Sequence, residues 1–339
     1  MSTAATLPRP VRAGDVRAGL PLAGAALLVA AVSALLAGWL PLGFSIVTVF
    51  LFAGPHNWLE ARYFLTRLPA RWGRLRGYFL FAFAGIFGLT AAFAALPWLG
   101  NSLAWDHDEW FAWQAFWNTA LVLWIVVLVQ MRSRQNPRRD WFWTLPIAFL
   151  LIALAWIEPF TWGLGLVYAH PLVAFWVLDR ELQRSRPAWR PAYHLCLLCV
   201  PLLLGVLWWR LADAPPLPGD DGLSVRIAQH AGASILQGVS SHLLVATHTF
   251  LEMLHYGIWV VAIPLVTLRG APWALRGVPL ARRSAAWHRA VLGLLAVGGL
   301  VVLLLWGCFL ANYPTTRDVY FTVALLHVLA EVPFLLRAL

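Results

Sequence analysis

Long apolar stretches recur from one end of this 339-residue sequence to the other, and they constrain its fold more than any other feature. A membrane-spanning helix needs about 20 apolar residues. Hydrophobic residues make up 61% of the chain and charged residues only 12%, whereas a soluble domain carries about 25% charged residues. We therefore predict an all-α, polytopic integral membrane protein that folds as a single helical-bundle domain over residues 1–339. About ten spans are predicted, at 20–38, 43–61, 77–98, 110–130, 141–157, 162–178, 193–209, 239–267, 290–311 and 318–337.

The positive charges of the chain follow the predicted spans. All 25 cationic residues are arginines, and they form short blocks between alternate spans. With a cytoplasmic N-terminus, every arginine except Arg210, Arg226 and Arg317 falls on the inner side, as the positive-inside rule expects. Both termini are then cytoplasmic, with 1–18 as an N-terminal tail. The net charge of +10 thus indicates topology rather than binding to nucleic acid, for which we predict no role.

The longest outside segment, 211–238, carries acidic residues and a stretch, SVRIAQHAGASILQGV, in which apolar residues recur at helical spacing. This pattern favours an interfacial helix within an extracytoplasmic loop. The predicted location is the bacterial inner (cytoplasmic) membrane, with membrane lipids as neighbours. The sequence leaves the oligomeric state open.

Three His-x-x-x-Glu units lie inside apolar spans: His56–Glu60, His248–Glu252 and His327–Glu331. Residues four apart share one face of a helix. An ionised side chain near the centre of a span costs about 2.5–3.5 kcal/mol on insertion scales, so such groups normally mark function. The same spans also run in one direction and hold these histidines at mid-depth, which would let the side chains meet at one level.

Imidazole and carboxylate groups on neighbouring helices are typical of a bundle that holds a redox metal. We predict metal ligation by His56, His248, His255 and His327, with His170 and His242 as reserve ligands. Glu60, Glu252 and Glu331 are predicted as catalytic residues or as partners of the ligand imidazoles. Non-haem iron is the expected cofactor, and another divalent transition metal stays open. A haem held by two histidines would leave the glutamates unexplained.

Three segments resemble the Brp/Blh-like carotene dioxygenases, which are polytopic membrane enzymes that cleave β-carotene to retinal at an iron held by four histidines. The segment FAGPHNWLEARYF resembles that family's Pro-His-Gly-x-x-Asp motif, LLHVLAEVPFLLRAL its closing helix, and HTFLEMLHY the helix with two histidines. Of the family's His-Phe-Gly segment only His170 offers a counterpart, and the histidines of the third segment are spaced differently. The resemblance implies a non-haem iron oxygenase that acts on a long isoprenoid.

The sequence therefore favours a membrane metalloenzyme, a non-haem iron oxygenase with a lipid-soluble, isoprenoid- or carotenoid-like substrate that enters from the bilayer. One alternative is a transporter or channel in which the same His and Glu side chains relay protons. A second alternative is a structural subunit of a membrane complex. These three hypotheses differ in whether the protein holds a metal and whether the glutamates matter.

Overall fold

The computed structural model of the chain describes residues 13–135, 141–268 and 271–338. Within these ranges the regular elements are all helices, and no strand occurs. The long helices are α1 (Ala13–Trp39), α2 (Pro41–Arg67), α3 (Arg76–Leu103), α4 (His107–Gln135), α6 (Pro159–Ser185), α7 (Arg190–Leu211), α9 (Ser241–Gly257), α10 (Ala285–Ala311) and α11 (Tyr313–Ala338). Shorter helices are α5 (Thr144–Ile157) and α8 (Gly222–His230), and α9 continues into two π-helical turns, Ile258–Ala262 and Pro264–Leu268. The predicted all-α class is confirmed.

Nine helices of the described residues are long and apolar enough to cross a membrane, which is typical of a multi-pass membrane protein. The predicted span 141–157 differs, because α5 has only 14 residues and is shorter than the about 20 that a span needs. Trp141 to Trp143 precede the helix, and Pro159 begins the next one. Glu158, in front of that proline, has left helical geometry (φ −144°, ψ 75°), as steric contact with the proline ring favours.

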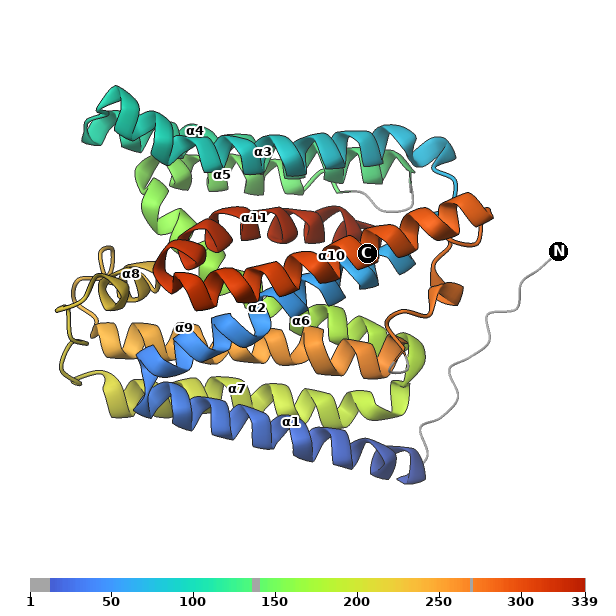
Figure 1. Ribbon diagram of the computed structural model, residues 1–339, viewed down its shortest axis with the longest axis horizontal. Coiled ribbons are helices and arrows are strands. Elements are labelled where there is room, and N and C mark those ends of the chain that lie inside the picture. The colour runs from blue at the N-terminus through green and yellow to red at the C-terminus, as the bar shows by residue number, and fades with distance from the viewer. Residues whose placement is uncertain (1–12, 136–140, 269–270, 339) are drawn as a thin grey trace. The chain divides into compact units, whose positions relative to one another are not determined.

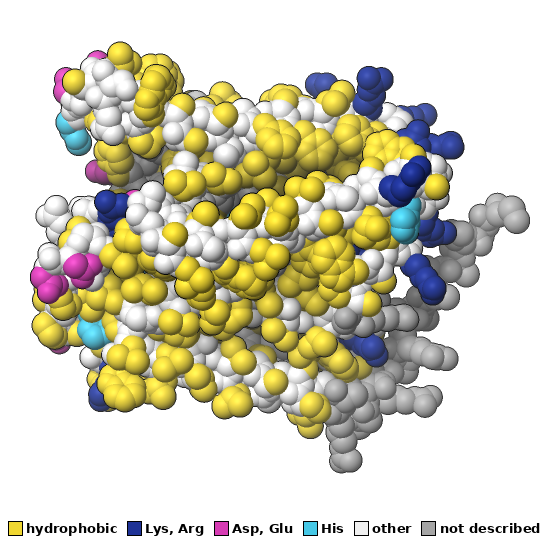
Figure 2. Space-filling view, viewed as in Figure 1, with side chains coloured by type: hydrophobic (Ala, Val, Ile, Leu, Met, Phe, Trp, Pro, Cys, Tyr) yellow, Lys and Arg dark blue, Asp and Glu magenta, His cyan; other side chains and the backbone are white. Residues whose placement is uncertain are grey.

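The chain divides into two compact units, each built from two segments of sequence. Unit 1 comprises 1–46 and 171–270, and unit 2 comprises 47–170 and 271–339. Helices α2 and α6 are each divided between the two units, because the boundaries fall inside them, after residue 46 and after residue 170. Figure 2 shows that apolar side chains cover the visible sides of the helices, whereas charged side chains gather near helix ends.

In unit 1, α1 lies alongside α7 and α9 (Figure 1). The α8 helix, which falls within the predicted interfacial stretch, packs Ile227 and Ala231 against Leu244 and Val245 of α9. The predicted tail 1–18 overlaps α1, which begins at Ala13, and residues 1–12 lie outside the described residues. Unit 1 thus combines long apolar helices with one short amphipathic helix.

In unit 2, α3 packs against α4 and α11, and α5 lies along α4. The core holds Tyr78 and Phe79 of α3 together with Leu128 of α4 and Leu329 of α11. Helices α3 and α4 approach closely because Gly85 has no side chain: a Cβ there would lie 1.9 Å from Nε1 of Trp124. This packing fixes α11, which carries two of the candidate site residues.

Candidate metal centre

Helix α2 places His56 and Glu60 on one face, and both side chains are buried, with exposures of 1% and 0%. Nδ1 of His56 lies 3.0 Å from the carbonyl oxygen of Phe52, one turn earlier. A carbonyl oxygen only accepts hydrogen bonds, so Nδ1 carries the proton and donates it. Nε2 of the neutral ring is then left with its lone pair. The helix backbone therefore sets the tautomer of His56 that suits metal binding.

Helix α11 supplies His327 and Glu331, and α6 supplies His170 at the edge of unit 2. Nδ1 of His170 lies 3.2 Å from Oε2 of Glu331, whose side chain is 2% exposed. An ionised carboxylate only accepts, so it favours a proton on Nδ1 and a lone pair on Nε2 of His170. This is the carboxylate–histidine arrangement that commonly orients metal ligands.

The three imidazoles meet through their Nε2 atoms. Nε2 of His327 lies 3.4 Å from Nε2 of His56 and 3.2 Å from Nε2 of His170. The ring of His327 stands edge-on to both neighbours, with centroids 5.0 Å apart in each pair. Imidazole nitrogens about 2.0–2.1 Å from one metal ion in tetrahedral geometry are roughly 3.3 Å apart. Each of these two spacings therefore suits a pair of nitrogens that share an ion.

Proton counting supports the same interpretation. With the protons of His56 and His170 on Nδ1, as the carbonyl oxygen of Phe52 and an ionised Glu331 favour, only Nε2 of His327 can donate within the cluster. An N–H at this atom can donate in only one of the two nitrogen–nitrogen contacts, and with the proton on Nδ1 of His327 instead, lone pairs face each other in both. A cation between the three nitrogens removes this repulsion.

Glu60 adds a negative charge beside the imidazoles. Its carboxylate and the ring nitrogens of His56 and His327 include atoms that all lie within 4.8 Å of one another. In the described part of the chain, neither carboxylate oxygen of Glu60 has a hydrogen-bond partner. An isolated buried carboxylate is strongly unfavourable. A metal ion bound to the imidazoles would neutralise it, so the donor set of unit 2 fits a divalent transition metal.

Each helix of the centre has a proline close to a site residue: Pro55 precedes His56, Pro171 follows His170, and Pro333 lies two residues after Glu331. A proline inside a helix removes one backbone hydrogen bond to the preceding turn. At the third of these prolines, the hydroxyl of Tyr78 donates to the carbonyl oxygen of Pro333 at 2.8 Å, which joins α3 to α11.

The third His-x-x-x-Glu unit lies on α9 and belongs to unit 1, together with His255. There Tyr256 donates its hydroxyl proton to Glu252 at 2.7 Å, and Nδ1 of His248 lies 3.9 Å from Oε2 of the same carboxylate. The reserve ligand His242 contacts the carbonyl oxygen of Gly38 through Nε2 at 3.0 Å, which accounts for it as a structural residue.

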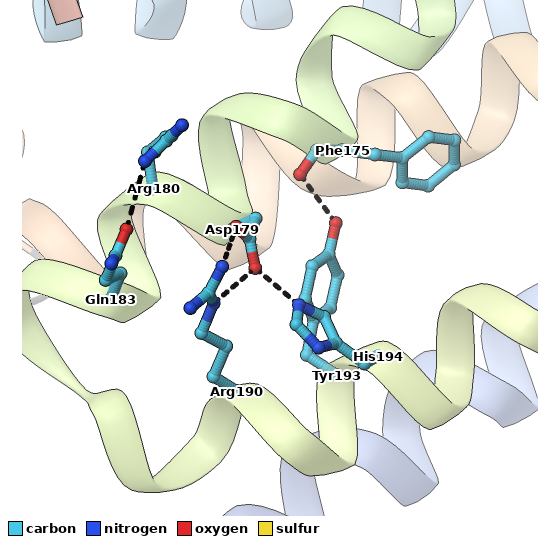
Figure 3. Close-up of polar contacts among 7 residues, drawn as sticks. All are labelled: Phe175, Asp179, Arg180, Gln183, Arg190, Tyr193 and His194. Carbon is cyan, nitrogen blue, oxygen red and sulfur yellow. Dashed lines mark hydrogen bonds and ion pairs between the residues drawn. The ribbon is translucent and has the colours of Figure 1, made fainter. Parts of the chain in front are cut away.

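A polar network in unit 1 was not predicted from the sequence (Figure 3). Asp179 of α6 accepts two hydrogen bonds from Arg190 of α7, each 2.7 Å long, and lies 2.6 Å from Nε2 of His194. Beside it the hydroxyl of Tyr193 donates to the carbonyl oxygen of Phe175 at 2.7 Å. The carboxylate is engaged by a guanidinium and an imidazole, so the network fastens α6 to α7. Nothing in the spacing of these residues distinguishes them in the sequence.

No protein-family model matches this chain, and no curated protein and no solved structure matches it either. The interpretation of the centre therefore depends on its own chemistry.

Proposed function

We propose that this protein is an integral membrane metalloenzyme in which His56, His170 and His327 bind one transition-metal ion. The observation that carries the proposal is that Nε2 of His327 lies 3.2 Å from Nε2 of His170 and 3.4 Å from Nε2 of His56, while Nδ1 of His56 and Nδ1 of His170 each face an acceptor. His170, which the sequence suggested only as a reserve ligand, is thus one of the three proposed ligands.

Non-haem iron is the metal we propose, because imidazole and carboxylate ligands with an open position are typical of iron oxygenases. When bound there, iron would supply the oxidative chemistry of the reaction. Among the protein groups, Glu331 holds the His170 ring in orientation and Glu60 balances the charge of the ion. Glu60 is also the group beside the centre that could accept a proton during turnover.

The substrate we propose is lipid-soluble and reaches the centre from the bilayer. Apolar helices surround the buried imidazoles, and the resemblance to carotene dioxygenases suggests an isoprenoid or carotenoid-like molecule. The sequence of the described residues provides long apolar helices rather than a hydrophilic catalytic domain. A bilayer substrate is consistent with this composition.

We further propose that both termini face the cytoplasm of a bacterial inner membrane. In unit 2 the arginine-bearing ends of three helices lie together: Arg337 of α11 donates to the carbonyl oxygen of Arg67 at 2.7 Å, and Arg132 of α4 donates to that of Leu336 at 3.3 Å. A cysteine at Arg74 should react with a membrane-impermeant maleimide only in inverted vesicles, and a cysteine at Asp108 only in intact cells. Labelling of both from one side would contradict this topology.

Metal content tests the proposed centre. Protein purified in detergent should contain about one equivalent of iron, and His56→Ala or His327→Ala should lose most of it, because each substitution removes one of three nitrogen ligands. His288→Ala is the matched control, since His288 is an exposed histidine of the same unit. Unchanged metal in both site variants, or none in the wild type, would contradict the proposal.

A proton relay is the second candidate function. Glu331, His170, His327 and His56 form a continuous line of titratable side chains with successive contacts of 3.2, 3.2 and 3.4 Å. Such lines are used for proton transfer in membrane transporters. This candidate requires pH-driven flux in proteoliposomes that is lost in His327→Ala, in protein that holds no stoichiometric metal.

A further inference from the structure

Two arginines from different helices meet at one end of unit 2, outside the metal centre. Nε of Arg132, in the last turn of α4, donates to the carbonyl oxygen of Leu336 at 3.3 Å, and Nη1 of Arg337 donates to that of Arg67 at 2.7 Å. Leu336 and Arg337 are consecutive residues of α11, so the two guanidinium groups lie close enough for their charges to repel each other. The guanidinium carbon of Arg337 also lies 5.2 Å from the centroid of the Phe79 ring. Each guanidinium is thus held in place through one of its nitrogens.

The remaining guanidinium nitrogens of both arginines are accessible at the surface. Both side chains are half-buried. Nη1 and Nη2 of Arg132, and Nε and Nη2 of Arg337, form no hydrogen bond with the described residues and are not buried. All four nitrogens carry N–H groups, which only donate. The end of unit 2 therefore presents a set of accessible donors that are positioned from three helices, α2, α4 and α11.

The positive charge at this end of unit 2 is only partly balanced. Within the described residues no carboxylate forms an ion pair with Arg132 or Arg337. The carbonyl oxygens that they contact belong to the last turns of α2 and α11, and a helix C-terminus contributes about half of one negative charge. Two guanidinium groups beside two helix ends therefore retain a net charge of about +1. One singly charged anion would balance this charge.

The surroundings place these donors at the headgroup level of a bilayer. Nε2 of Gln130 in α4 donates to Oγ1 of Thr144 at 3.5 Å, which sets the start of α5 beside the end of α4. There Trp141 and Trp143 stack with ring centroids 5.9 Å apart, and Trp143 is 55% exposed. Tryptophan near the ends of spans is typical of the headgroup level. The cytoplasmic leaflet, toward which we place this end, contains anionic lipids.

We propose that Arg132 and Arg337 together bind the phosphate group of an anionic phospholipid. A phosphodiester carries one negative charge, and guanidinium N–H groups match its oxygens in charge-assisted hydrogen bonds. Helix α3 contacts Arg337 through Phe79. The same helix exposes Leu80 and Phe87 by 51% and 60%, which provides apolar surface for acyl chains and favours a lipid over a phosphate ion from water. This proposal depends on the proposed membrane location but not on the metal centre.

The test measures lipid binding to the full-length protein in dodecyl maltoside by native mass spectrometry. Phosphatidylglycerol is compared with diacylglycerol, which has the same chains and no phosphate, and inorganic phosphate is added as a competitor. The wild type should bind one phosphatidylglycerol at least about tenfold more tightly than diacylglycerol, a difference of roughly 1.4 kcal/mol. Arg132→Gln and Arg337→Gln should each weaken this preference, and the double variant should abolish it. Arg134→Gln, at an exposed arginine of the same helix, removes the same charge and should leave the preference unchanged.

Arg132→Lys with Arg337→Lys covers the case in which the double glutamine variant does not fold, since lysine retains the charge and should keep a weakened preference. Equal binding of the two lipids by the wild type would overturn the proposal without any variant. A wild-type preference in the double glutamine variant would overturn it too, as would an equal loss in Arg134→Gln, which would assign the effect to total charge. Displacement of the lipid by inorganic phosphate would contradict the assignment to a lipid. Iron content should not change in any of these variants, which separates failure here from failure of the metal centre.

Discussion

His170 faces Glu331 with one ring nitrogen and His327 with the other: the two contacts, from Nδ1 and from Nε2, are both 3.2 Å long. The carboxylate holds one side of the ring, and the opposite lone pair points toward the other imidazoles. The pairing joins α6 to α11 across 161 positions of sequence, from residue 170 to residue 331. This relationship makes Glu331 a positioning residue rather than a ligand in our account.

Glu331→Gln should weaken metal binding by about 10- to 100-fold, the usual effect of losing a carboxylate that orients a ligand histidine. The ring of His170 would keep a neutral acceptor but lose the negative charge. Metal affinity measured by competition with a chelator checks this. Glu181→Gln, at another buried glutamate, should not change the affinity.

Glu60→Gln should change the thermal stability of the protein in opposite directions with and without bound metal. In protein stripped by a chelator, the substitution removes a buried carboxylate without a partner, so thermal stability should stay equal or rise. In metal-loaded protein it removes a charge that balances the ion, so stability should fall. Melting curves in both states, with exposed Glu158→Gln as control, measure the difference. A loss of stability of equal size in both states would show that Glu60 has a purely structural role.

Gly85→Ala should destabilise unit 2 by about 1–3 kcal/mol, as overpacking of a filled interface does. The added methyl group would lie 1.9 Å from Trp124, whose Nε1 donates to the carbonyl oxygen of Phe81 at 3.3 Å. Gly88→Ala on the same helix meets nothing within 4 Å and should be neutral or mildly stabilising. Unfolding in detergent compares the two, and equal stability of both variants would argue against close packing of α3 on α4.

Asp221 should make the first turn of α8 sensitive to acid. The hydroxyl and backbone N–H of Ser224 and the backbone N–H of Leu223 donate to this carboxylate, and these bonds hold its pKa below the ordinary value. The stabilisation is therefore complete above the ordinary pKa of about 3.9 and is lost as the pH falls through the lowered pKa of the folded state. NMR shifts of residues 222–226 should report this fraying. Asp221→Ala should remove the transition, and Asp220→Ala should keep it.

The sequence is a good guide to those parts of the molecule that depend on local composition. Within the described residues, nine of the ten spans predicted from hydropathy correspond to membrane-length helices, and the i, i+4 spacing places His56 with Glu60 on one face of α2. The sequence does not predict where a helix begins or which distant residues a side chain contacts. Trp141, Phe142 and Trp143 were counted within the predicted span 141–157, yet the helix begins only at Thr144.

The sequence could not predict that His170 is a proposed ligand rather than a reserve ligand, because this too depends on distant contacts. A histidine beside a proline in an apolar helix has no distinctive spacing, and its value as a ligand depends on the rotation of α6 relative to α11. The partners of Arg62 are likewise carbonyl groups more than 200 positions away, with sequence separations of 210 and 212. Backbone acceptors leave no trace in side-chain identity, so only the folded structure identifies them.

Locating the metal ion itself tests the central claim most directly. Anomalous diffraction at the iron edge, from crystals of the purified protein, should show one peak within about 2.2 Å of Nε2 of His56, His170 and His327, the bonding distance for imidazole. A peak elsewhere in the chain, or density for three imidazoles joined only by hydrogen bonds, would contradict the account.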